Sequence, residues 1–172
     1  LAAPAGAQQW QHYGGDAGGR KFSPLRQINA GNVGQLEVAW QYRTGELERH
    51  PPLHTAMAKV QVNPILLPAA AGGHLMICTP FGRVVALDPA RGTERWVFDP
   101  KVEMKSGGAA TMPRCRGVTQ WTDPAAPAGA PCQQRILYGT WAFRVYAVDA
   151  RTGQRCSGFG NQGEVALDPG RR

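Results

Sequence analysis

Long apolar runs, helical periodicity and recognisable catalytic motifs are all scarce in this 172-residue sequence. No apolar run approaches the roughly 18 residues that a membrane-spanning helix needs. The absence of CxxC, HExxH and GxSxG patterns argues against thioredoxin-type, zinc and serine-hydrolase sites, and no catalytic carboxylate pair stands out. The glycine cluster at 14–19 lacks GxGxxG spacing, so a phosphate-binding loop is not expected. Surface or packing roles are expected for the four histidines, His12, His50, His54 and His74.

Positive charge is in excess but is not concentrated. The chain has 19 lysines and arginines and a formal net charge of +7. These residues are scattered along the sequence without interleaved aromatics, whereas a nucleic-acid-binding surface would show a basic cluster. The charge therefore indicates no nucleic-acid partner. It is compatible with an ordinary basic surface or with attraction to anionic lipid head groups.

One segment of the chain occurs twice. Residues 84–96 read VVALDPARGTERW and residues 145–156 read VYAVDARTGQRC. Each copy has an apolar run, an aspartate, a glycine-containing turn and a short stretch that ends in a large or apolar residue. This order is typical of two strands joined by a tight turn. A unit of this kind cannot cover its own apolar face, so it stacks on copies of itself.

The repeat predicts an all-β fold, namely part of a β-propeller with about two four-stranded blades and flanking pieces. Short strands are expected at 36–42, 60–67, 74–79, 83–87, 94–98, 115–121, 135–139, 143–148 and 164–167. The expected organisation is an irregular lead-in at 1–31, propeller blades at 32–172 and a polar loop at 46–59. Two blades alone leave unpaired edge strands and an uncovered apolar face. The chain is therefore expected to be a fragment of a longer protein, or a subunit that another chain completes.

Structural roles are predicted for the repeated polar and aromatic residues. Asp88 and Asp149 are expected to accept hydrogen bonds from backbone N–H groups of the tight turns. Trp96 is expected to lie flat between adjacent blades while its N–H meets a carbonyl oxygen. Trp40 precedes it at a similar spacing, and we interpret 36–42 as a degenerate copy of the final strand of the repeat. Cys156 replaces the tryptophan in the second copy.

The four cysteines allow up to two disulfides in an oxidising compartment. Cys115 and Cys132 flank one loop-like insertion, and closing such a short loop costs little chain entropy, so a bond between them is expected. Cys78 lies inside an apolar run and is expected to be a buried free thiol.

One element breaks the repeat and invites a functional interpretation. Arg114 and Arg116 flank Cys115 just before a glycine. In a β-protein with an axial channel, such guanidinium groups would suit an anionic ligand, because they bind carboxylates through two parallel hydrogen bonds. The alternative is a surface arginine beside a disulfide.

The order of these motifs resembles the amino-terminal part of the catalytic domain of the pyrroloquinoline-quinone (PQQ) dependent dehydrogenases, closest to the membrane-bound glucose dehydrogenase branch. The most specific segments are FSPLRQIN at 22–29, CTP at 78–80 and CRGV at 115–118. The other matching positions are 10, 13–14, 20–21, 32–33, 36, 39–40, 43–45, 64–65, 75–77, 86–88, 96, 99–100 and 159–163. A single Cys115, where soluble alcohol dehydrogenases of the family have two adjacent cysteines, favours the glucose dehydrogenase branch.

The resemblance implies an eight-bladed propeller with PQQ on its axis beside a calcium or magnesium ion. Arg116 would pair with the oxygens of the quinone, and Gln61 would hydrogen-bond one of its carboxylates. Cys115 and Thr140 are the other residues implied to contact the cofactor. The metal ligands and the catalytic base of the family lie beyond residue 172, so this chain alone is expected to be inactive.

The function implied is that of a periplasmic enzyme attached to the inner membrane through a segment outside this chain. Such an enzyme oxidises a sugar, polyol or alcohol and passes electrons to ubiquinone or a cytochrome. The alternative is a non-catalytic propeller that acts as a scaffold or binding module. The inward arginine expected at residue 116 distinguishes the two, because a scaffold has no use for it.

Overall fold

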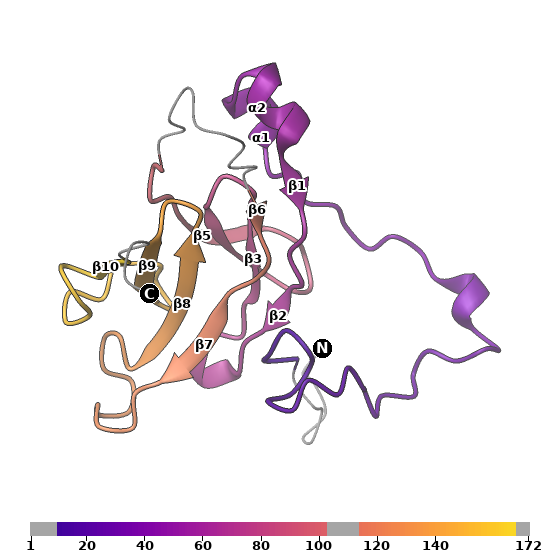
Figure 1. Ribbon diagram of the computed structural model, residues 1–172. Coiled ribbons are helices and arrows are strands. Elements are labelled where there is room, and N and C mark those ends of the chain that lie inside the picture. The colour runs from indigo at the N-terminus through magenta and orange to yellow at the C-terminus, as the bar shows by residue number, and fades with distance from the viewer. Residues whose placement is uncertain (1–9, 103–113, 168–172) are drawn as a thin grey trace.

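The computed structural model describes residues 10–102 and 114–167, and it contains two four-stranded antiparallel sheets (Figure 1). The first sheet, here the first blade, has strands in the order β2 (Ile65–Leu66), β3 (Leu75–Cys78), β4 (Val84–Leu87) and β5 (Glu94–Phe98). The second blade has the order β7 (Thr119–Thr122), β8 (Gln134–Thr140), β9 (Arg144–Asp149) and β10 (Glu164–Ala166). The prediction of two blades of four short strands is confirmed.

Two further strands join the blades. β1 (Lys59–Val60) pairs in parallel with β6 (Arg114–Cys115), with Val60 opposite Cys115. Each of these strands leads into the first strand of its own blade, so the leading edges of the two blades run side by side in the same direction (Figure 1). This is the arrangement of neighbouring blades around a propeller axis. The number of blades in the complete ring stays a prediction.

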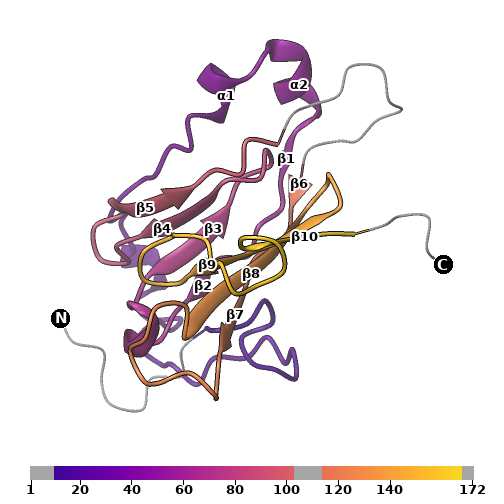
Figure 2. The ribbon, with the colours of Figure 1, turned by 90° about the vertical axis from the view of Figure 1, so that its left-hand side faces the viewer.

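The core lies between the two blades, which stack against one another (Figure 2). Met76 and Val84 from the first blade and Ile136 and Val148 from the second are fully buried. Phe98 from β5 packs edge-on against Tyr138 of β8, at a centroid distance of 6.2 Å. The apolar faces that alternate along the strands are therefore buried against the neighbouring blade, as the repeat predicts.

The segment 46–59 is not simply a loop. It forms two short helices, α1 (Glu46–Arg49) and α2 (Pro52–Met57), followed by β1. Pro52 is the first residue of α2, where its fixed φ angle suits a helix and its missing N–H has no cost. Two single 3-10 turns also occur, η1 (Val33–Gln35) and η2 (Ala69–Ala71).

The strand expected at 36–42 is absent, and this prediction was wrong. Residues 20–39 extend away from both sheets (Figure 1), and Leu36 and Val38 are exposed. A strand needs a neighbour for its backbone hydrogen bonds, and no described residue supplies one here. The described part of the lead-in, residues 10–31, joins neither blade, and the division of the chain at residue 31 stays a prediction. Residues 1–9 lie outside the described structure, as do 103–113 and 168–172 within the predicted propeller part.

Both disulfide expectations were wrong. Cys78 bonds to Cys115, and Cys132 bonds to Cys156, so no free cysteine remains. Strand β7 lies between Cys115 and Cys132 in sequence and carries Cys132 to the opposite end of the second blade. A four-residue strand spans about 13 Å, whereas the Cα atoms of a disulfide lie within about 7 Å. Blade geometry therefore outweighs the small entropy cost of a short loop.

Candidate functional site

Gln61 and Arg116, two residues predicted to contact the cofactor, lie beside one another. Each follows directly after the parallel pair of β1 and β6, in which Val60 faces Cys115. The parallel alignment continues beyond them, since the backbone N–H of Asn63 donates to the carbonyl oxygen of Arg116 at 3.3 Å. Both side chains are exposed at the leading edges of the blades. Two segments more than fifty residues apart in sequence thus present an amide and a guanidinium from the same place.

Thr140 lies at this same end of the second blade. Leu137 faces Thr119 in the antiparallel pair of β7 and β8, so the residues after Leu137 run toward the same end as those before Thr119. Thr140 is half-buried, and its Cγ2 lies 3.7 Å from the point where a Cβ atom at Gly82 would stand. The turn between β3 and β4 therefore reaches the same region from the first blade. We call this end of the two blades, with Gln61, Arg116, Thr140 and Gly82, the Arg116 end.

Cys115 is buried behind the Arg116 end and is bonded to Cys78 of the neighbouring blade. It carries no free thiol. Whatever contact it makes with a ligand would be made by the disulfide as a whole. The bond connects the last residue of β3 with the last residue of β6.

Asn63 is a residue of this region that the sequence analysis missed. Besides its backbone bond to Arg116, its side-chain amide donates to the carbonyl oxygen of Tyr13. The backbone of the lead-in also accepts a hydrogen bond at Trp10 from Leu66, at 2.8 Å. The lead-in is thereby held against the first strand of the first blade. No sequence signal pointed to Asn63, because its bond to Arg116 is made by the backbone.

A buried ion pair lies next to the turn between β3 and β4, which is part of the Arg116 end. The guanidinium of Arg83 donates to the Glu46 carboxylate at 3.0 Å, and both side chains are only 6% exposed. His50 lies 3.0 Å from the other oxygen of Glu46 and stacks on Phe81 with ring centroids 3.6 Å apart. These contacts hold α1 against the turn between β3 and β4. A pocket of about 290 Å³ lies beside them, and Lys101 is part of its lining.

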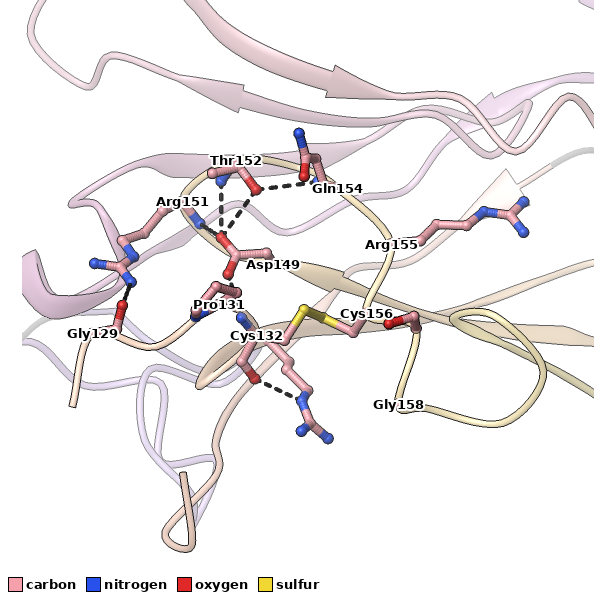
Figure 3. A pocket seen from close by; sticks show the side chains of 12 residues that line it. Gly129, Pro131, Cys132, Asp149, Arg151, Thr152, Gln154, Arg155, Cys156 and Gly158 are labelled. Carbon is pink, nitrogen blue, oxygen red and sulfur yellow. Dashed lines mark hydrogen bonds between the residues drawn. A yellow bond between two sulfur atoms is a disulfide. The ribbon is translucent and has the colours of Figure 1, made fainter. Parts of the chain in front are cut away.

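A larger pocket, of about 550 Å³, lies at the opposite end of the second blade (Figure 3). Asp149 borders this pocket and pairs with Arg135 at one end of the ladder between β8 and β9. At the other end of the ladder, which is the Arg116 end, Thr140 pairs with Arg144. The carboxylate of Asp149 accepts backbone hydrogen bonds from Arg151 at 2.9 Å and from Thr152 at 3.0 Å (Figure 3). It thus holds the turn of the repeat, and the structural role predicted for it is confirmed.

Asp88 plays the same part in the first blade. Its Oδ1 accepts from the backbone N–H groups of Ala90 and Arg91 at 2.8 and 2.9 Å. Burial raises the pKa of Asp88, but these two hydrogen bonds and the ion pair with Arg95 outweigh that effect, so its pKa lies below 3.8.

The residues at the Arg116 end fit an anionic, oxygen-rich cofactor such as PQQ. Gln61 and Arg116 supply an amide and a guanidinium as hydrogen-bond donors. The hydroxyl of Thr140, which donates to the Arg144 carbonyl oxygen at 3.4 Å, keeps acceptor capacity at the same end of the second blade. Within residues 10–102 and 114–167, no group of three His, Cys, Asp or Glu side chains could hold a metal ion. In that same part of the chain, no helix is long and apolar enough to cross a bilayer.

Two neighbouring four-stranded blades, joined at their leading edges, define a domain of the β-propeller class. The profile of the family described as PQQ glucose/ethanol/alcohol dehydrogenase, β-propeller domain, matches residues 10–172. The chain belongs to this family.

Curated relatives agree with this assignment. The chain is 38% identical over 169 residues to the glycerol dehydrogenase large subunit of Gluconobacter oxydans, covering 98% of this chain and 22% of that protein. It is 36% identical over 169 residues to the quinoprotein glucose dehydrogenase of Escherichia coli, covering 96% of this chain and 20% of that protein. The chain therefore spans about a fifth of the length of these relatives.

Among solved structures, the quinohemoprotein alcohol dehydrogenase of Comamonas testosteroni superposes with a TM-score of 0.63 at 26% identity. The superposition covers 85% of this chain and 18% of that one. The chain thus matches part of a quinohemoprotein alcohol dehydrogenase in fold.

Proposed function

We propose that this chain is the amino-terminal part of a PQQ-dependent dehydrogenase that oxidises a sugar, polyol or alcohol. The observation that carries the proposal is the convergence of Gln61, Arg116 and Thr140 on one end of two blades of this family. Three different segments supply them, so the fold and not local sequence brings them together. Membership of the family favours this function over a non-catalytic scaffold.

Arg116 is the main cofactor anchor in this proposal. Its guanidinium presents a planar set of donors that can bind a carboxylate or a pair of quinone oxygens through two parallel hydrogen bonds. The amide of Gln61 would add a neutral donor beside it. The hydroxyl of Thr140 would have to turn away from the Arg144 carbonyl oxygen, its partner at 3.4 Å, to donate to the cofactor from the second blade. When bound, PQQ would supply the carbonyl that accepts hydride from the substrate. The chain's own residues bind and orient the cofactor.

The remaining parts of the proposal lie outside this chain. The metal ligands and the general base that takes the substrate proton would come from later residues of the intact protein. The ring is proposed to have eight blades, and electrons are proposed to pass to ubiquinone or a cytochrome. The intact enzyme is proposed to work in the periplasm, attached to the inner membrane. Relatives named for glycerol and glucose support a polyhydroxylated substrate in this proposal.

The proposal is tested by titrating the intact protein with PQQ, following fluorescence quenching, and assaying dye reduction with sugars, polyols and alcohols. Arg116→Ala should weaken PQQ binding by about 1.5–3 kcal/mol, roughly 10- to 150-fold, since a charge-assisted hydrogen bond is lost. Arg91→Ala is the matched control, because Arg91 is an exposed arginine in the turn at the opposite end of the first blade. Unchanged PQQ affinity in Arg116→Ala, or no PQQ binding by the intact protein, would refute the proposal.

A further inference from the structure

The disulfide between Cys78 and Cys115 lies one residue from the proposed cofactor anchor. Cys78 is 2% exposed and Cys115 is 6% exposed, and their Cα atoms are 5.9 Å apart. Cys115 ends β6, and Arg116 follows it directly. The bond thus joins the first blade to the backbone that carries the arginine.

Within residues 10–102 and 114–167, few backbone ladder bonds hold this piece of chain, although Cys115 and Val118 pack into the core. β6 is two residues long and pairs only with β1, which is equally short. The ladder between β7 and β8 begins at Thr119, three residues after Arg116. Between these points the backbone N–H of Asn63 donates to the carbonyl oxygen of Arg116, at 3.3 Å. An isolated two-residue ladder is weak by itself, because strands need longer pairing and packing for independent stability.

We propose that the Cys78–Cys115 disulfide is a positioning device for Arg116, and that Cys78 and Cys115 are positioning residues and not cofactor ligands. The inference rests on the proposed function. A disulfide restricts the two Cα atoms to a narrow range of separation, so the backbone of Cys115 keeps a fixed place relative to the first blade. The Cα atom of Arg116, from which its exposed side chain extends, is then held in a fixed position. Binding gains when a contact group is held in place before the ligand arrives.

The second disulfide provides a matched comparison. Cys132–Cys156 also closes a loop of moderate length, with a sequence separation of 24 against 37. It lies at the pocket beside Asp149, at the opposite end of the second blade from Arg116 (Figure 3). Both bonds should stabilise the folded protein by restricting the unfolded chain. Only Cys78–Cys115 is placed to act on the cofactor.

The experiment compares Cys78→Ala/Cys115→Ala with Cys132→Ala/Cys156→Ala in the intact protein. Unfolding midpoints are measured for both, and PQQ affinity is measured by fluorescence well below the lower midpoint. Both variants should unfold at a lower temperature. The first should bind PQQ at least about tenfold more weakly, and the second should change affinity by less than about threefold. Equal effects on affinity would overturn the inference.

A third variant separates positioning from a general loss of structure. The third variant combines Arg116→Ala with Cys78→Ala/Cys115→Ala. If the disulfide acts through Arg116, the total loss of PQQ affinity in this variant, relative to the wild type, should be smaller than the product of the two separate losses. Fully multiplicative effects would contradict the inference. Should the double-alanine variant fail to fold, Cys132→Ala/Cys156→Ala is treated with graded reductant and the open cysteines are counted by alkylation. PQQ affinity must then fall as Cys78–Cys115 opens and return on reoxidation, and affinity independent of that bond overturns the inference.

The two levels of proposal fail in different ways. If the unmodified protein does not bind PQQ, the proposed function is wrong. If it binds PQQ and needs Arg116 but tolerates loss of Cys78–Cys115, only the positioning role is wrong.

Discussion

The indole of Trp96, on the last strand of the first blade, covers Gly153 in the turn of the second blade. A Cβ atom at Gly153 would stand 2.5 Å from Cε3 of Trp96, and the indole N–H donates to the carbonyl oxygen of Ala150 at 3.3 Å. Trp40 covers Gly92 in the same manner and donates to the carbonyl oxygen of Pro89 at 3.2 Å. Each tryptophan therefore packs against the glycine turn that follows it in the chain and donates a hydrogen bond to that turn.

The docking predicts that Gly153→Ala destabilises the intact protein. The new methyl group would overlap the indole, and φ of +72° is itself unfavourable for alanine. Overpacking and the left-handed backbone together should cost about 2–5 kcal/mol. The control is Gly129→Ala, where φ is +80° but nothing lies within 4 Å of the added carbon. Denaturant unfolding should show a clearly larger loss for Gly153→Ala, and equal losses would contradict the docking.

The repeat made these contacts predictable because it shows the same residue types at matching places. The aspartate turns, the two four-stranded blades and the docking of Trp96 follow from it and are confirmed. Trp40 was placed by spacing alone and does dock, although its segment forms no strand. Docking needs only one glycine turn, whereas a strand needs a neighbour that the described chain does not contain.

The candidate site was less predictable. Gln61 and Arg116 were each nominated from a family resemblance, but nothing in the sequence shows that their segments run in parallel. The Cys78–Cys115 bond was missed for the same reason, because it depends on how two blades sit together. Asn63 makes its key bond through the backbone, and backbone bonds leave no residue-type pattern in the sequence.

The buried pair of Glu46 and Arg83 predicts a second outcome. Glu46→Ala would leave the Arg83 guanidinium buried without its carboxylate, which should cost about 3–5 kcal/mol of folding stability. The control is Arg20→Ala, which removes an ion pair whose arginine is 75% exposed, and such surface pairs contribute little. Thermal unfolding of the intact protein should separate the two variants. A Glu46→Ala midpoint as high as that of Arg20→Ala would show that the buried pair contributes nothing.

The lowered pKa of Asp88 predicts that the folding stability of the protein falls at acidic pH. Because its folded pKa lies below 3.8, the ionised carboxylate adds stability that is fully present above that value and is lost as the pH falls through the folded pKa. Asp88→Asn keeps an oxygen for the bonds to Ala90 and Arg91 but removes the charge near Arg95. The unfolding midpoint of the wild type should exceed that of Asp88→Asn at neutral pH, and the gap should shrink in acid. A gap that stays constant with pH would disprove the charge effect.

The lowered pKa of His74 predicts a further loss of folding stability, at a pH nearer to neutral. It lies edge-on to Trp96 at the junction between blades, with ring centroids 6.4 Å apart. Burial lowers the pKa of His74 below 6.5; a hydrogen bond to the backbone of Arg151 partly opposes this, and the nearby charges of Arg95 and Asp88 act in opposite directions. The folded protein therefore favours the neutral imidazole. Protonation favours the unfolded chain, so stability is full above 6.5 and falls as the pH drops through the unfolded and then the folded pKa.

Replacing this histidine should remove that dependence. His74→Gln keeps a polar side chain of similar length but has no proton to gain. The wild type should lose more of its unfolding midpoint than His74→Gln when the pH is lowered from neutral to just below the folded pKa of the histidine. Because the imidazole lies against Trp96, the wild-type loss should be accompanied by a change in tryptophan fluorescence that His74→Gln lacks. Parallel loss in both proteins would mean that the acid sensitivity arises elsewhere in the molecule.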